Sequence, residues 1–238
     1  MLDTPKHKAT MYGIVMDIFT SPIAEKLAFK GGTLAFFHYG LDRFSTDIDI
    51  DVIDGKISDE IKETIENILL KYGKTKKDYE NQISMRYKLS YGEKDLNVKV
   101  ELNTRIRKNN KYEIINFRGI SIRAMEKSTI FANKLFAFIN RQEMVMRDLR
   151  DIHFFFQKGF PINEEVILER LKIKDIKGIK TFKDFIKYLR NILSKDIKPT
   201  HIVDANLGIV LSDTQKQRAR TQLIPRTIAY LDFLLESK

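Results

Sequence analysis

Two acidic residues in the first quarter of the chain have the spacing of a metal-binding pair. Asp47 and Asp49 belong to a stretch, residues 47–53, in which acidic and apolar residues alternate. On a β-strand, alternate side chains project from the same face, so the two carboxylates converge on one surface. Close like charges are costly unless a cation lies between them, and oxygen ligands suit Mg²⁺ or Mn²⁺. The pair therefore predicts a divalent-metal site of the kind used in phosphate chemistry.

A third carboxylate would complete such a site. We expect it to be Glu101, which alternates with apolar residues in a second strand-like segment. Asp51 follows Asp49 on the same face and competes for this role. The alternative for the whole set is an ordinary exposed strand face, on which acidic residues are common.

A glycine turn precedes the acidic pair. Gly31-Gly32-Thr33 comes directly before a helix-like apolar run. Small residues at the start of a helix let backbone amides approach a phosphate, so this turn predicts nucleotide binding by Gly31, Gly32 and Thr33. Each of these residues also has a purely structural alternative. The glycines would serve turn conformations, Arg43 would form a surface salt bridge, and Ser45 would cap a strand.

A second polar set lies further along the chain. Lys134, Arg141 and Asp148 are spaced seven residues apart, with Asp151 one turn later. On one continuous helix they would share a face. That face could simply be solvated, and a helix break between residues 140 and 147 would remove the shared register.

The elements that must position these residues change character along the sequence. Apolar periodicity predicts an α/β segment first and helices afterwards. We expect a helical opening segment, with a helix over Tyr12–Phe19 and a short helix from Ser21-Pro22 before the apolar stretch 27–29. A helix over 34–39, a strand over 47–53 and a helix capped by Ser58 should follow. Strands over 83–91 and 96–106 should form a hairpin, with a further strand over 119–123. Helices are expected over 125–140, 147–157, 163–171, 181–193 and 212–236.

Composition limits the classes of function. The 238 residues contain no cysteine, which excludes disulfides, thiolate-bound zinc and cysteine nucleophiles and favours a cytoplasmic location. No apolar run is long enough for a membrane helix, and residues 1–10 lack a signal-peptide core. The net charge of +10 suits a polyanionic partner such as RNA or a nucleoside triphosphate. The basic residues between Lys172 and Lys195 could bind such a partner or be a solvated surface.

The motif Gly31-Gly32-Thr33-Leu34, with Tyr39, Arg43, Ser45 and Asp47-Ile48-Asp49, resembles the nucleotidyltransferase-like abortive-infection toxins of the AbiEii type. The resemblance implies an α/β (α+β) nucleotidyltransferase fold of the DNA polymerase beta-like superfamily, with a mixed sheet, flanking helices and a helical C-terminal region. It also implies that Asp47 and Asp49 hold magnesium, that Gly32 and Ser45 contact a triphosphate, and that Arg43 counters its charge.

The second polar set matches the same family. Its members carry a helical Lys, an Arg, and then an Arg-Asp-x-x-Asp segment, which correspond here to Lys134, Arg141 and residues 147–151. The resemblance, over roughly residues 10–155, implies that Lys134 and Arg141 bind nucleotide phosphates and that Asp148 orients Lys134 or acts as a general base. We expect a nucleotidyltransferase core over residues 1–124 and a helical region over 125–238. Within that region, residues 125–155 would complete the active site and 156–238 would bind the acceptor.

The function implied is magnesium-dependent transfer of a nucleoside monophosphate from a nucleoside triphosphate to an acceptor, with release of pyrophosphate. A tRNA acceptor and a cognate antitoxin protein, in a phage-defence system, are expected from the resemblance. A protein acceptor, a phosphotransferase acting at the γ-phosphate, and an inactive nucleotide- or RNA-binding module are the alternatives.

Overall fold

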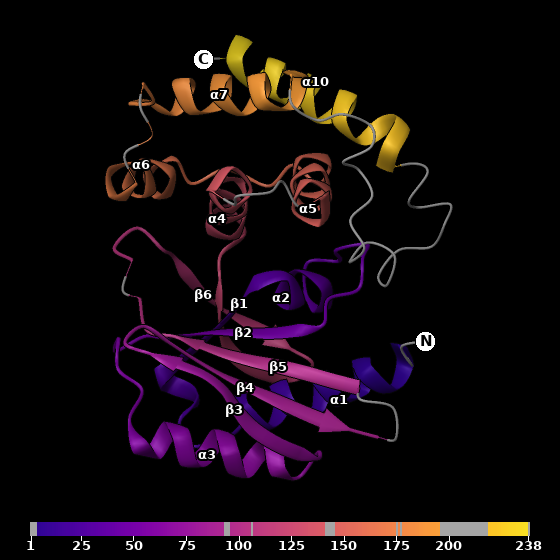
Figure 1. The fold of residues 1–238 in the computed structure, drawn as a ribbon, viewed down its shortest axis with the longest axis vertical. Coiled ribbons are helices and arrows are strands. Elements are labelled where there is room, and N and C mark those ends of the chain that lie inside the picture. Colours follow the sequence, from indigo (N-terminus) through magenta and orange to yellow (C-terminus); the bar gives the residue numbers. More distant parts are fainter. Residues whose placement is uncertain are drawn as a thin grey trace. The chain divides into compact units, whose positions relative to one another are not determined.

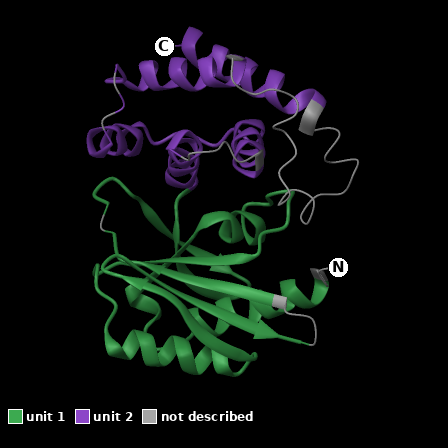
Figure 2. Cartoon of the chain, viewed as in Figure 1, with its two compact units in different colours: residues 1–126 green, residues 127–238 purple. Residues whose placement is uncertain are grey.

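The computed structural model describes residues 4–92, 96–105, 107–140, 146–174, 176, 178–195 and 219–237. The chain divides into two compact units, Met1–Glu126 and Lys127–Lys238 (Figure 2). In the described parts of the chain, no helix is long and apolar enough to cross a membrane.

The first unit is built on a seven-stranded mixed sheet with the strand order β3-β4-β5-β2-β1-β7-β6 (Figure 1). Strand β2 runs parallel to β5, and β1 runs parallel to β7, whereas the other neighbours are antiparallel. The strands are β1 (Leu27–Lys30), β2 (Asp47–Val52), β3 (Lys74–Asn81), β4 (Ser84–Tyr91), β5 (Leu96–Asn103), β6 (Tyr112–Phe117) and β7 (Ile120–Met125).

Two helices, α1 (Thr4–Phe19) and α3 (Asp59–Leu70), cover one face of this sheet, as Figure 1 shows. The fully buried Ile48 and Ile50 of β2 are directed into this core, because they alternate with the acidic residues of the strand. Ser58 caps α3, since its hydroxyl oxygen accepts a hydrogen bond from the Ile61 amide at 3.3 Å. The polar residues of β2, β4 and β5 lie on the opposite face of the sheet.

The strand predicted over 47–53, the hairpin strands over 83–91 and 96–106, and the capped helix are confirmed as β2, β4, β5 and α3. The link between β4 and β5 at residues 93–95 lies outside the described residues. The short helix predicted before the apolar stretch 27–29 is a 3-10 helix, Ala24–Lys26, and the stretch itself, which the sequence interpretation did not assign to a strand, belongs to β1, Leu27–Lys30. The sequence interpretation also missed β3 and β6.

The second unit consists of helices. They are α4 (Lys127–Asn140), α5 (Met146–Gln157), α6 (Glu164–Ile173), α7 (Phe182–Lys195) and α10 (Ile224–Glu236), the last preceded by a π-helical turn, Ala219–Leu223. Helix α4 packs against α5 and α6, and α10 packs against α7 and α5. Arg190 of α7 and Asp232 of α10 form an ion pair of 2.6 Å. The five predicted helices are confirmed over their described residues, and residues 212–218 of the last one lie outside the described residues.

Candidate active site

Helix α2 (Gly31–Phe37) begins directly against the acidic strand. Gly31 has a φ of +78°, and a Cβ atom there would lie 2.1 Å from Oδ2 of Asp49. A side chain at this position would therefore collide with the carboxylate, and the left-handed conformation also favours glycine. The predicted glycine turn is itself the first turn of the helix, with Lys30 at the N-cap making no side-chain capping bond.

Arg43 and Ser45 lie beside the second glycine. A Cβ atom on Gly32 would lie 3.0 Å from Oγ of Ser45 and 3.3 Å from Nη2 of Arg43. Both side chains are buried, with relative exposures of 4% for Arg43 and 9% for Ser45. A buried guanidinium and a hydroxyl next to the first turn of a helix form a group of donors suited to phosphate oxygens.

Thr33 joins this first turn to the strand. Its buried hydroxyl lies 3.0 Å from Oγ of Ser45 and also hydrogen-bonds the backbone carbonyl oxygen of Asp47. The structure thus brings together all seven residues predicted for the glycine turn and the acidic pair, which are Gly31, Gly32, Thr33, Arg43, Ser45, Asp47 and Asp49.

The third acid of β2 has a different environment. Asp51 is buried, and its two oxygens are occupied by Nζ of Lys30 at 2.5 Å and the hydroxyl of Tyr112 at 2.8 Å. This network ties β2 to β1 and β6. Asp51 therefore does not compete as the third metal ligand, because both of its oxygens already have partners within the sheet.

Glu101 lies opposite Asp49 in the parallel pairing of β5 with β2. Paired residues project from the same face, so Glu101 and the acidic pair share the polar side of the sheet. Ser84 donates a hydrogen bond to Oε1 of Glu101 at 3.1 Å. Within the described ranges, no three His, Asp or Glu side chains are grouped closely enough to hold a metal ion, so a site with three carboxylates stays a prediction.

Tyr39 fixes the far end of α2. Its hydroxyl lies 2.9 Å from Oε1 of Glu113 and 3.0 Å from the carbonyl oxygen of Met125. Burial and the neighbouring Glu113 carboxylate raise the pKa of the Tyr39 hydroxyl, which therefore stays protonated. The tyrosine of the sequence motif thus has a positioning role, since it anchors the helix whose first turn contacts Asp49.

The second polar set lies in the second unit, on two helices rather than one. Nζ of Lys134, on α4, lies 2.9 Å from Oδ1 of Asp148 and 3.0 Å from Oδ2 of Asp151, both on α5. Both aspartates are fully buried. Of the two arrangements left open by the sequence, the structure has two separate helices, α4 ending at Asn140 and α5 beginning at Met146, so packing of two helices makes the contact. Arg141 lies outside the described residues.

Comparison with known protein families supports the family resemblance seen in the sequence. A family profile described as "Nucleotidyl transferase AbiEii toxin, Type IV TA system" matches residues 14–223, well over half of the chain. The chain belongs to the AbiEii family. It is accordingly a nucleotidyltransferase of the toxin type, and membership implies a nucleoside triphosphate substrate and an antitoxin partner.

Solved structures support the fold of this AbiEii-family chain. A candidate nucleotidyltransferase from H. pylori is 23% identical, with a TM-score of 0.61 over 100% of this chain and 99% of its own. JHP933 from Helicobacter pylori is 21% identical, with a TM-score of 0.55 over 100% and 97%. At these identities the likeness shows the fold alone. No curated protein matches the sequence.

The sequence interpretation missed two residues that contact β2, the strand that carries Asp47 and Asp49. Lys30, next to Gly31, holds Asp51 together with Tyr112. Lys30 could have been noticed as a charged residue at the end of an apolar run. Tyr112 gave no such signal, because its strand was not predicted.

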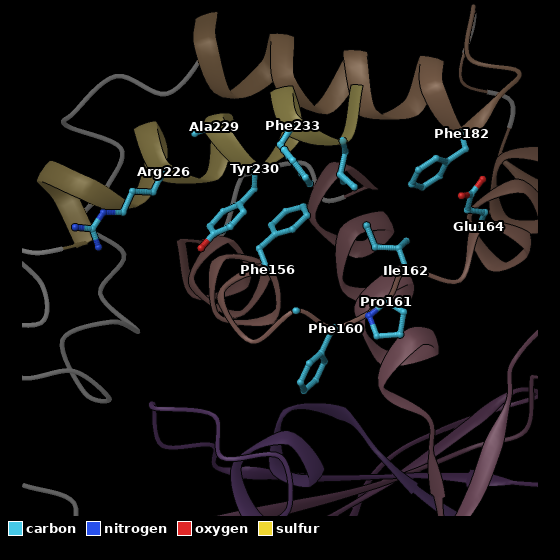
Figure 3. A pocket seen from close by; sticks show the side chains of 12 residues that line it. Phe156, Phe160, Pro161, Ile162, Glu164, Phe182, Arg226, Ala229, Tyr230 and Phe233 are labelled. Atoms are coloured by element: carbon cyan, nitrogen blue, oxygen red, sulfur yellow. The ribbon is translucent and has the colours of Figure 1, made fainter. Parts of the chain in front are cut away.

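A cavity of about 730 Å³ in the second unit was also not predicted. It lies among α5, α10 and the segment between α5 and α6, and its walls are mostly apolar, with five aromatic rings among the twelve lining residues (Figure 3). The rings of Phe156 and Tyr230 are stacked there, with centroids 5.3 Å apart and planes inclined by 6°. The run of phenylalanines at 154–156 was the available signal, but it is equally typical of a helix core.

Proposed function

We propose that this chain is a divalent-metal-dependent nucleotidyltransferase that transfers a nucleoside monophosphate to tRNA. The observation that carries the proposal is the contact between the first turn of α2 and β2, where Gly31 leaves room only for the Asp49 carboxylate. The hydrogen-bond donors proposed for the phosphates and the acids proposed as metal ligands therefore both belong to one short segment of the chain, residues 31–49. That arrangement suits the binding of a triphosphate together with its cation.

The acidic pair fits a divalent cation. Asp47 and Asp49 project from one face of β2, and Glu101 is the third candidate ligand, directly across from Asp49. Carboxylate oxygens are the ligands that Mg²⁺ and Mn²⁺ prefer. A cation held there would act as a Lewis acid on the phosphate being attacked and would neutralise charge that develops on it.

The chain's own donors would hold the triphosphate for in-line attack. The first-turn amides of α2 have no intrahelical partner, so they can donate to phosphate oxygens. Ser45 would donate its hydroxyl hydrogen, and the Arg43 guanidinium would counter the negative charge. These groups are held rigidly by Thr33 and by burial, so they need little rearrangement when the nucleotide binds.

For Asp148 we favour the positioning role over that of general base. It is fully buried, and its Oδ1 lies 2.9 Å from Nζ of Lys134. A general base must reach the proton that it removes, whereas a buried carboxylate holding an ammonium group can orient it. In this proposal Lys134, with 18% of its side chain exposed, is the residue of the pair that binds a nucleotide phosphate.

The acceptor is proposed to be tRNA, because the net charge of +10 favours a polyanion and toxins of this superfamily modify tRNA ends. A protein acceptor is the second candidate. In the cell we propose a cytoplasmic toxin of a phage-defence system, held inactive by a cognate antitoxin.

The test is incubation of the purified protein with total tRNA, Mg²⁺ and each α-³²P-labelled nucleoside triphosphate in turn. We expect label on RNA with one or more of the nucleotides. The variant Asp47→Asn/Asp49→Asn should lose this activity by at least about a thousandfold, because the cation loses its charged ligands. Asp54→Asn/Asp59→Asn makes the same charge change at exposed positions outside β2 and should remain active.

Each other outcome corrects a particular part of the proposal. Label on protein would replace the acceptor but keep the reaction. Release of a nucleoside diphosphate instead of pyrophosphate would identify a phosphotransferase. Equal activity in the two double variants would remove Asp47 and Asp49 from the mechanism.

A further inference from the structure

Three lysines form a straight row across the polar face of the sheet. Lys76 on β3 pairs with Lys88 on β4, and Lys88 pairs with Lys99 on β5. Lys99 pairs in turn with Asp47 on β2. Directly paired residues project from the same face of a sheet, so three ammonium groups lead across neighbouring strands to the acidic pair.

Such a row is unfavourable without an anionic partner. Like charges directly opposite one another on a sheet destabilise the pairing. In the described part of the chain, no carboxylate lies within 4.0 Å of these three lysines, whereas other lysines of the unit do have one. Lys77 and Lys62, for example, both pair with Glu80. Within the described residues, therefore, no carboxylate close to the row offsets the repulsion between its three ammonium groups.

Protection of a sheet edge does not account for the whole row. Strand β3 is an edge strand, and exposed lysines on such strands discourage association with other sheets. That reason applies to Lys76, but β4 and β5 are interior strands with neighbours on both sides. Lys99 is exposed and Lys88 half-buried, so both can be reached from solvent.

The row extends away from the predicted triphosphate site. In the strand order, β5 lies on one side of β2, whereas β1, which leads into the first turn of α2, lies on the other. With neighbouring strands roughly 4.8 Å apart, Lys76 is three strand spacings, or roughly 14 Å, from the Asp47 position. A partner that follows the whole row must therefore be a longer polyanion than a single triphosphate.

An aromatic residue beside the row favours a nucleic acid among polyanions. Tyr79 pairs with Arg86 at the adjacent register of the same face, and 45% of its surface is exposed. The Arg86 guanidinium carbon lies 5.7 Å from the centre of the Tyr79 ring. Exposed aromatic rings next to basic side chains are platforms on which unpaired bases stack.

We propose that the row Lys76, Lys88 and Lys99 binds successive backbone phosphates of the single-stranded end of the RNA acceptor and leads that end to Asp47. An unpaired base of the RNA stacks on the Tyr79 ring beside the row. The inference rests on the proposed function for the identity of the RNA as acceptor. The binding itself requires neither metal nor nucleotide, and so it can be tested separately.

The experiment measures binding of a fluorescein-labelled oligouridylate by anisotropy over a series of salt concentrations, without nucleotide or metal. The variant Lys76→Gln/Lys88→Gln/Lys99→Gln is compared with Lys26→Gln/Lys62→Gln/Lys71→Gln, which removes three lysines that already have carboxylate partners. Each variant lowers the net charge from +10 by three, to +7. Thermal unfolding of both variants checks that they are folded.

We expect the row variant to bind at least about tenfold more weakly at low salt, and its slope of log affinity against log salt to fall by about 2, or roughly 0.7 for each lost phosphate contact. The control variant should keep the slope of the unmodified protein. Equal losses in the two variants would overturn the inference, because only net charge would then matter. An unchanged affinity in the row variant would overturn it too.

Transfer assays separate this inference from the proposed function. In the row variant, the KM for RNA should rise while the KM for the nucleoside triphosphate stays within about twofold of the unmodified value. A raised KM for the nucleotide instead would assign the row to the triphosphate and overturn the inference. The unmodified protein could show no transfer while the row variant still binds RNA more weakly than the unmodified protein does. In that case the proposed function fails, and the inference that the row binds RNA is retained.

Discussion

At the scale of single residues, Gly31 controls how closely α2 can approach the acidic strand. Gly31→Ala should abolish transfer and lower the free energy of unfolding by more than the roughly 1 kcal/mol that a left-handed alanine costs, because its Cβ would displace the Asp49 carboxylate. Gly40→Ala is a matched control, since Gly40 has a φ of +75° and no atom within 4 Å of the added Cβ. Urea unfolding and transfer rates of the two variants check this, and equal effects would contradict the contact.

Thr33 gives a second prediction at this scale. Thr33→Val keeps the shape of the side chain but removes the hydroxyl that joins Ser45 to the Asp47 carbonyl group. We expect a loss of about 1–3 kcal/mol in the free energy of unfolding, because buried polar partners are left unsatisfied. Thr33→Ser keeps the hydroxyl and should lose less. Denaturant unfolding measures both, and a Val variant as stable as the Ser variant would show that the hydrogen bonds contribute little.

At the scale of elements, Lys134 joins α4 to α5 through two buried carboxylates. Lys134→Met should cost about 3–5 kcal/mol, since it leaves both carboxylates without their shared cation. Lys134→Met/Asp148→Asn/Asp151→Asn removes the stranded charges and should recover much of that stability. If Lys134 also binds the nucleotide, this triple variant will be folded but inactive. Recovery of activity together with stability would reduce Lys134 to a structural role.

His7 makes the packing of α1 sensitive to pH. It is fully buried, contacts the Tyr91 hydroxyl through Nδ1, and has its pKa lowered chiefly by burial. Below a pH of about 6.5 the unfolded chain binds a proton that the folded chain resists, so stability should fall as the pH drops through this value. His7→Gln should be less stable at neutral pH but lose less on acidification. Urea unfolding at neutral and mildly acidic pH tests this, and parallel losses would exclude His7 as the cause.

Strand β2 and helix α3 could be predicted from the sequence, because each has one apolar face and one polar face. Strand β2 alternates strictly, so its period of two was readable, and Ser58 marked the start of α3. Strand β1 has three consecutive buried residues, and β3 is exposed along almost its whole length, so neither shows alternation. The β6–β7 turn uses Arg118 and Gly119 with positive φ values of 52° and 95°, a feature that residue types indicate only weakly.

At the scale of the whole molecule, contacts between residues close in sequence could be predicted from their spacing, whereas contacts made by tertiary pairing could not, and the contact of Lys134 with Asp148 was expected only from the family resemblance. Gly31 and Asp49 meet because β1 and β2 are antiparallel neighbours close in sequence. The contact of Lys134 with Asp148 and Asp151 depends on the packing of two helices, and the lysine row depends on the registers of four strands. Neither register nor helix packing follows from spacing along the chain.

The most direct test of the central claim follows both ends of the triphosphate in one reaction. The purified protein is incubated with tRNA, Mg²⁺ and a nucleoside triphosphate labelled at either the α- or the γ-phosphate. Nucleotidyl transfer predicts α-label on the RNA and γ-label released as pyrophosphate, with both signals lost in Asp47→Asn/Asp49→Asn. Transfer of γ-label to the acceptor, or undiminished α-transfer by that variant, would contradict the account.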